Sequence, residues 1–215
     1  MKKLTIITAL SLMFTMFLQA QITPKIGMTF SKNNGMEQDF LDYPDAKTPF
    51  KPGYSIGVGY DIQISEAISL QPNLQYIQKG AKLTLIDEVA EFKLSESINL
   101  NYLEMPVLIK FGLGSAKTFF LYGGPSIGYW LNGNFTISFE DTSTGDSDTL
   151  SEKIIFDEDT NRTEFSLQLG MGYLIANKIL LDVKYGIGLS DISSFGDTAS
   201  KNRVLQLSIG MPFNL

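Results

Sequence analysis

The sequence predicts an all-β protein, an eight-stranded antiparallel up-and-down transmembrane β-barrel of the outer-membrane type. Three observations lead to it: apolar and polar residues alternate along most of the chain, the alternating segments number eight, and short and long connections alternate between them. Alternation with period two is the pattern of a strand that has one apolar and one polar face. The 19 glycines and the 12% aromatic content also favour a turn-rich β protein.

Before the first strand, the sequence predicts a secretory signal peptide over residues 1–20. Lys2 and Lys3 form a basic start, and an uncharged, mostly apolar run follows over residues 4–18. This run is too short for a helix that crosses a bilayer, which needs about 20 apolar residues. The barrel domain is therefore expected to occupy residues 21–215.

Eight candidate strands follow one another along the rest of the chain. They cover residues 22–31, 54–63, 68–76, 104–111, 119–131, 164–173, 179–190 and 205–215. Short links lie at 65–67, 113–117 and 177–178, and long polar links lie at 32–53, 87–94, 139–162 and 191–202. This arrangement is typical of outer-membrane barrels, whose turns are periplasmic and whose loops are extracellular. The cell outer membrane is therefore the predicted location.

The two faces of these strands differ in charge and in side-chain size. The apolar face is uncharged and holds large residues, whereas most of the strand glycines lie on the polar face, as the crowded interior of a small barrel requires. We therefore expect the polar face to line the lumen and the apolar face to contact lipid. The charged residues of the predicted lumen are Lys25, Asp61, Glu104, Lys110, Glu164, Asp182 and Lys184. Because buried charges must be paired, we expect them to form a structural network that plugs the barrel.

Three β-rich runs are too long for the membrane alone. Residues 68–86, 95–112 and 118–138 are nearly twice the ~9–11 residues that a transmembrane strand needs. Their short turns hold them near the periplasmic rim, so the surplus is expected to project outward as a twisted sheet. The charged residues expected at its tip are Lys82, Glu88, Glu91, Lys93 and Glu96.

One segment resembles the motif of a known family. Residues 102–110, YLEMPVLIK, are similar to the YLEIPLLLK motif of PorT-like outer-membrane β-barrel proteins, and residues 70–80 and 122–129 fit neighbouring motifs in the same order. The resemblance implies an outer-membrane barrel, and a few members of the family are linked to protein secretion. No functional residue is carried over with it.

Composition excludes several kinds of chemistry. The chain has no His and no Cys, which removes the usual general base, the commonest transition-metal ligand and thiolate nucleophiles, so we expect neither an enzyme nor a cofactor. A net charge of −6 argues against a nucleic-acid partner. Residues 157–161 begin like a calcium loop, but Arg162 replaces the required glycine. A solvated loop is expected there, with a weak cation site as the alternative.

These features predict a non-enzymatic outer-membrane protein with a plugged polar lumen, which displays its loops for a structural or interaction role. The expected partners are outer-membrane lipid and an extracellular protein or glycan, and the barrel is expected to be a monomer. Two alternatives stay open at this point: narrow, porin-like transport of small solutes, and a role in a protein secretion system.

Overall fold

The computed structural model describes residues 21–35, 46–87, 91–114, 117–156, 161–192 and 200–214. The expected signal peptide and Glu88 lie outside these residues. The strands are β1 (Gln21–Asn33), β2 (Ala46–Lys47), β3 (Lys51–Gln63), β4 (Ile68–Asp87), β5 (Phe92–Leu113), β6 (Phe119–Asp141), β7 (Ser147–Lys153), β8 (Thr163–Ile175), β9 (Ile179–Gly188), β10 (Asn202–Gly210) and β11 (Phe213–Asn214). Within the described part of the chain, no helix is long and apolar enough to span a membrane.

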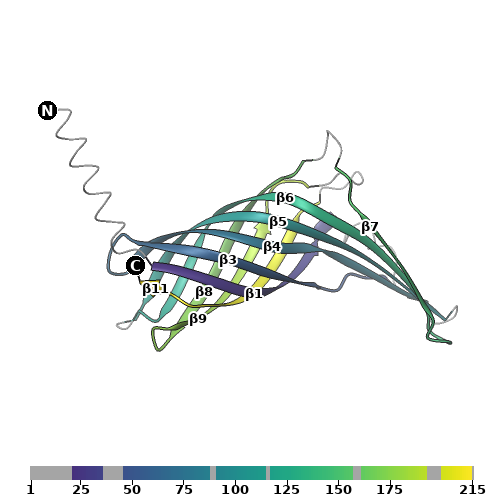
Figure 1. The fold of residues 1–215 in the computed structure, drawn as a ribbon, viewed down its shortest axis with the longest axis horizontal. Helices are drawn as coiled ribbons and strands as arrows, with labels where there is room; N and C mark the ends of the chain where they lie inside the picture. Colours follow the sequence, from purple (N-terminus) through teal and green to yellow (C-terminus); the bar gives the residue numbers. More distant parts are fainter. Residues whose placement is uncertain are drawn as a thin grey trace.

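Eight of these strands close into a ring. Their order is β1, β3, β4, β5, β6, β8, β9 and β10, and β10 pairs with β1 to complete the barrel (Figure 1). Each neighbouring pair is antiparallel, and apart from the closing pair β10–β1, each ring strand pairs with the ring strand that follows it in the chain. The predicted eight-stranded up-and-down barrel is therefore confirmed.

The connections at one rim are short. Residues 64–67 join β3 to β4, residues 114–118 join β5 to β6, and residues 176–178 join β8 to β9. In the last of these turns, Ala176 and Asn177 have φ angles of 49° and 56°. Positive φ at both central residues matches the right-handed twist of a hairpin, which explains the tight connection. This short-turn rim is the periplasmic one in outer-membrane barrels.

At the opposite rim, three strands continue far beyond the rest. β4, β5 and β6 contain 20, 22 and 23 residues, whereas β8, β9 and β10 contain 13, 10 and 9. β3 last pairs with β4 at Ile77, and β8 last pairs with β6 at Tyr129, so about ten residues of each long strand lie above the ring. At ~3.3 Å per residue this projection is about 30 Å long, and Figure 1 shows it as a curved sheet beyond the barrel. We call residues 78–87, 92–101 and 132–141, together with β2 and β7, the raised sheet.

The structure corrects three predicted connections. The link at 139–162 is not only a loop, because β7 pairs with β6 inside it, and the link at 32–53 contains β2, which pairs with β4. The link at 87–94 shrinks to residues 88–91 because both strands extend into it. The predicted last strand, 205–215, is interrupted before β11, where Pro212 has no N–H to donate to the ladder.

The two faces of the barrel wall separate as the alternation predicts. The outward side chains Ile26, Ile56 and Leu169 are 66%, 57% and 52% exposed. The inward side chains Ser55 and Gln168 are 2% and 3% exposed. Apolar residues therefore cover the outside of the ring, where lipid lies, and polar residues fill its centre.

Candidate functional site

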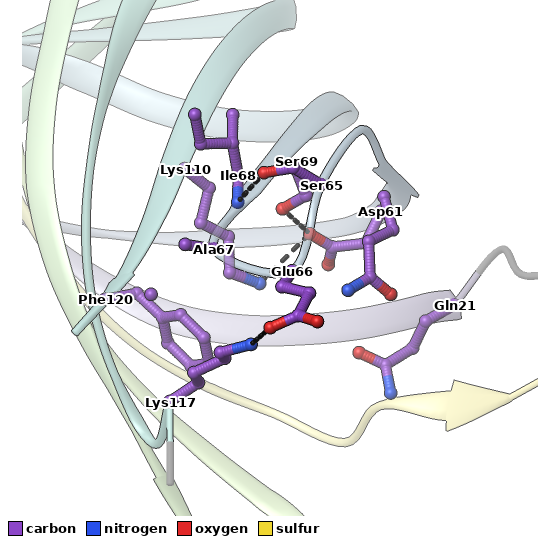
Figure 2. Close-up of a pocket in the computed structure, with 12 residues that line it drawn as sticks. Gln21, Asp61, Ser65, Glu66, Ala67, Ile68, Ser69, Lys110, Lys117 and Phe120 are labelled. Atoms are coloured by element: carbon purple, nitrogen blue, oxygen red, sulfur yellow. Dashed lines mark hydrogen bonds and ion pairs between the residues drawn. The ribbon is translucent and has the colours of Figure 1, made fainter. Parts of the chain in front are cut away.

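The lumen begins at the short-turn rim with an open vestibule of about 220 Å³ (Figure 2). Asp61 lies at its inner end and accepts three hydrogen bonds, from Lys110 Nζ at 3.0 Å, Ser69 Oγ at 3.2 Å and Gln71 Nε2 at 2.5 Å. Both carboxylate oxygens accept hydrogen bonds and one of the donors is a lysine, so the vestibule ends on a paired charge.

A second charged group lies next to the first. Lys25 Nζ is 3.0 Å from Asp182 Oδ2 and also donates to Gln71 Oε1 at 3.4 Å, which connects the two groups. The hydroxyl of Tyr122 donates to the other carboxylate oxygen of Asp182. Asp182 is therefore held from two sides, by β1 and by β6.

The third group contains a lysine between two carboxylates. Lys79 Nζ is 2.9 Å from Glu104 Oε1 and 2.9 Å from Glu164 Oε1. The remaining carboxylate oxygens accept from Gln75 Nε2 at 2.6 Å and from Asn202 Nδ2 at 2.7 Å. The three charged side chains are 2–3% exposed, so this cluster excludes bulk water.

Lys184 lies beside this cluster without a carboxylate at ion-pair distance among the described residues. Its Nζ donates to Gln75 Oε1 at 3.3 Å, and Gln206 Nε2 donates to the same oxygen. The space between these groups, bounded by Lys79, Glu104 and Lys184, is only about 10 Å³. A cavity needs ~10–15 Å³ to hold one water molecule, so this level of the lumen has no room for a water column.

Above the charges, the lumen is closed by apolar side chains rather than polar ones. The buried members of this apolar cluster are Ile77, Leu100, Tyr102, Trp130, Ile192 and Val204. Tyr102 and Trp130 are stacked with ring centroids 6.3 Å apart, and Phe156 meets the Trp130 ring edge-on at 4.8 Å. Lys79 Nζ lies 4.9 Å from the centre of the Tyr102 ring, so the cluster packs directly on the third charged group. The prediction of a polar lumen is therefore incomplete, because the end near the long loops is apolar.

Six of the seven predicted lumen residues are thus distributed over three groups, and the seventh, Lys184, lies beside the third group and donates to Gln75. Asp61 pairs with Lys110, Lys25 with Asp182, and Glu104 and Glu164 share a lysine that the sequence analysis did not name. That lysine, Lys79, has the same parity as Gln71, Asn73 and Gln75 on β4. The signal was present, but Ile77 interrupts the polar face between Gln75 and Lys79 and makes the alternation harder to follow.

The acidic side chains of the described residues do not gather into a metal site. No group of three or more Asp and Glu side chains in the described ranges is arranged to hold a metal ion. Most of the calcium-like segment, residues 157–160, lies outside those ranges, and Arg162 after it donates to the backbone oxygens of Trp130 and Leu131. The buried carboxylates all face lysine, amide or hydroxyl donors, which suits a structural role.

Solved structures similar to this chain include Ail, the attachment invasion locus protein of Yersinia pestis, at 14% identity, with 91% of this chain and 99% of that chain covered and a TM-score of 0.46. Neisserial surface protein A is similar at 12% identity, with 91% of this chain and 97% of that chain covered and a TM-score of 0.45. OprG from Pseudomonas aeruginosa is similar at 12% identity, with 92% of this chain and 97% of that chain covered and a TM-score of 0.42. No curated protein matches significantly.

A family model spans most of the sequence. The outer membrane protein beta-barrel domain matches residues 14–194, which include seven of the eight ring strands. The closed antiparallel ring, its apolar outer surface and this match agree on one location, the cell outer membrane. The chain belongs to the family of the outer membrane protein beta-barrel domain.

Proposed function

We propose that this protein is a non-enzymatic outer-membrane barrel that conducts no solutes and presents the raised sheet outside the cell as a binding platform. The observation that carries the proposal is the contrast between the two ends of the molecule. The lumen is filled by paired charges and then by the apolar cluster, whereas the raised sheet extends about 30 Å beyond the ring. A transport protein needs a continuous path through its centre, and a binding protein needs surface outside.

The similarity of residues 102–110 to PorT-like proteins supports a more specific placement, in which the protein works beside a secretion apparatus. In this chain the motif has a clear packing role. Tyr102, Glu104 and Lys110 all point into the lumen, where they are 0%, 2% and 9% exposed. The motif therefore supports a shared barrel interior, and the proposed binding role rests on the raised sheet instead.

Conductance in planar bilayers tests the closed lumen. The refolded protein is expected to give no current steps above those of the lipid alone, with a 16-stranded porin as the positive control, because porins of that size keep an aqueous channel. Reproducible steps from the pure protein would contradict the closed lumen and favour narrow, porin-like transport.

Photo-crosslinking on intact cells tests the platform. A photoreactive residue placed at Leu150 or Thr149, both on the raised sheet, is expected to form crosslinks to external macromolecules. The same residue at Lys178, in a short turn, serves as the control and is expected to form none with added external proteins. Crosslinking from the turn but not from the sheet would contradict the proposal.

A further inference from the structure

The polarity of the wall reverses where the strands leave the barrel. On β5, Tyr102 and Glu104 face the lumen, and the residues of the same face continue upward as Leu100, Ile98, Glu96, Leu94 and Phe92. Residues directly opposite each other on paired strands share a face. The inner side of the raised sheet is therefore mostly apolar, although the ring below it is polar inside.

A β-bulge extends this apolar face onto β6. Tyr102 pairs with Trp130 but Asn101 pairs with Asn132, so Leu131 is an extra residue on β6. One extra residue turns every later side chain to the opposite face. Because of the bulge, Ile137 and Phe139 lie on the inner side, whereas an unbroken ladder would place Thr136 and Ser138 there.

The apolar residues nearest the free end form one patch. We define the inner patch as Phe92, Leu94, Ile137, Phe139 and Leu150. Phe92 and Phe139 are stacked with ring centroids 5.5 Å apart, Leu94 pairs with Phe139, and Ile137 pairs with Leu150 across the β6–β7 ladder. Phe139 is 48% exposed and Leu150 is 73% exposed, so this end of the patch is open to solvent.

On the outer side of the same strands, polar side chains pair with one another. Thr136 and Ser151 are joined by a 3.0 Å hydrogen bond, Ser138 and Thr149 by one of 3.1 Å, and Lys93 is paired with Glu140 at 2.7 Å. This side suits contact with water. The inner patch is thus the side that gains from being covered.

Carboxylates surround the inner patch. Glu96 lies opposite Ile137, Asp148 opposite Phe139, and Glu152 opposite Phe135, and none of the three has an ion-pair partner among the described residues. At the end of β6, the Ser143 hydroxyl and the N–H groups of Thr144 and Ser143 lower the pKa of Asp141, which keeps that carboxylate charged as well.

This charge pattern selects among the occupants of an apolar face. A second copy of the chain would bring the same carboxylates into contact, and anionic lipid headgroups or sulfated glycans would be repelled. The free edge of β7 carries Asp148, Glu152 and Lys153, and charges of that kind discourage the addition of another strand. A cationic partner with an apolar face has neither problem.

We propose that the inner patch is the docking site for a basic amphipathic segment of a partner protein, whose apolar residues cover Phe139 and Leu150 while its Lys or Arg side chains meet Glu96, Asp148 and Glu152. This inference rests on the proposed binding role of the raised sheet. It specifies which face of the sheet binds and what chemistry the partner has. The recognition mode is an amphipathic element laid on an apolar surface.

Peptide binding to the full-length protein in zwitterionic nanodiscs tests the partner chemistry. The probe is a synthetic amphipathic Leu/Lys peptide, with a Leu/Glu peptide and a Ser/Lys peptide as controls and empty nanodiscs as the background. Only the Leu/Lys peptide is expected to bind above background, and raising NaCl from about 0.1 M to about 1 M should weaken it, because the Debye length falls from about 10 Å to about 3 Å. Equal binding of the Leu/Glu or Ser/Lys peptide would overturn the proposal.

Matched substitutions test the face. Leu150→Ser on the inner side is expected to weaken peptide binding about tenfold, whereas Thr149→Ser, the adjacent outer residue, should leave it unchanged. Glu152→Gln should weaken binding about threefold, and Glu140→Gln on the outer side should not. Equal effects within either pair would overturn the proposal, as would a concentration-dependent dimer that Leu150→Ser abolishes, since the patch would then bind a second copy.

The cell-surface crosslinks separate this inference from the proposed function. Crosslinks from the inner Leu150 position support both. Crosslinks from the outer Thr149 position alone would keep the platform and overturn the docking face. Absence of crosslinks from both positions would contradict the platform itself.

Discussion

Lys79 is the position where the structure makes its strongest energetic prediction. Its ammonium group is 2.9 Å from a carboxylate oxygen of Glu104 and 2.9 Å from one of Glu164, and all three side chains are 2–3% exposed. Replacing the lysine with methionine fills a similar volume but leaves the two buried carboxylates without the ammonium group that bridges them. Breaking a buried ion pair on one side costs ~3–5 kcal/mol, and we expect Lys79→Met to lower the free energy of unfolding by that amount.

The control uses an ion pair of the same residue types outside the barrel. Lys93 and Glu140 are 2.7 Å apart, but their side chains are 37% and 42% exposed. Exposed pairs contribute ~0–1 kcal/mol because water and salt screen them, so Lys93→Met should have a small effect. A triple variant, Lys79→Met with Glu104→Gln and Glu164→Gln, removes every charge of the cluster and should recover most of the lost stability.

The measurement is reversible urea unfolding in phospholipid vesicles, followed by tryptophan fluorescence. Trp130, the only tryptophan of the chain, lies in the apolar cluster above Lys79, so its emission reports on the relevant end of the barrel. The mobility of unboiled samples on a gel confirms that each variant forms a closed barrel. Two results would contradict this role of the cluster. One is a Lys79→Met variant that loses no more unfolding free energy than Lys93→Met, and the other is a triple variant that is less stable than Lys79→Met alone.

Three further predictions test the lipid face, the topology and the base of the raised sheet. Leu169→Arg, in the middle of β8, should cost ~2–4 kcal/mol and impair assembly, whereas Ile175→Arg, near the short-turn rim, should cost ~0–1 kcal/mol; equal costs would show that the membrane lies elsewhere. Trypsin added to intact cells should cut after Lys153 on the exposed strand β7 and spare Lys178 in the short turn, and the reverse pattern would invert the topology. Gly80→Ala should destabilise the raised sheet, because φ there is +141° and a Cβ would lie 1.8 Å from a β5 carbonyl oxygen; unchanged protease resistance of that sheet would contradict this.

Much of the fold could be predicted from alternation alone, because a strand that separates lipid from a polar lumen must alternate strictly. The lengths of the three long runs also predicted the raised sheet, since residues beyond the thickness of the membrane must lie outside it. β7 could not be predicted in the same way. Only Leu150 is apolar in Ser147–Lys153, because both faces of that strand are exposed and alternation carries no signal without burial.

The apolar cluster was missed for a related reason. Tyr102 has the same parity on β5 as Glu104 and Lys110, and Trp130 faces inward opposite it on β6, so alternation places both rings correctly but says nothing about what they contact. Their role depends on side chains from several strands and loops converging at one level, among them Ile192, which lies on the link after β9. Contacts between segments that are distant in the sequence produce no periodic pattern within any one segment.

The bulge at Leu131 connects the membrane, the lumen and the proposed binding surface. Below it, β6 turns Tyr129 toward lipid and Trp130 toward the lumen, and above it the parity reverses. The outer face of a strand must be apolar within the lipid and polar in the water above it. A strand that continues from one into the other therefore turns its apolar residues outward in its lower part and inward in its upper part. Arg162 satisfies the backbone at this point, with donors 2.8 and 2.9 Å from the Trp130 oxygen and 3.1 Å from the Leu131 oxygen. Arg162, which replaces the glycine of a calcium loop, therefore supports the backbone at the bulge. The reversal of faces at this bulge leaves an apolar face of β6 open above the barrel.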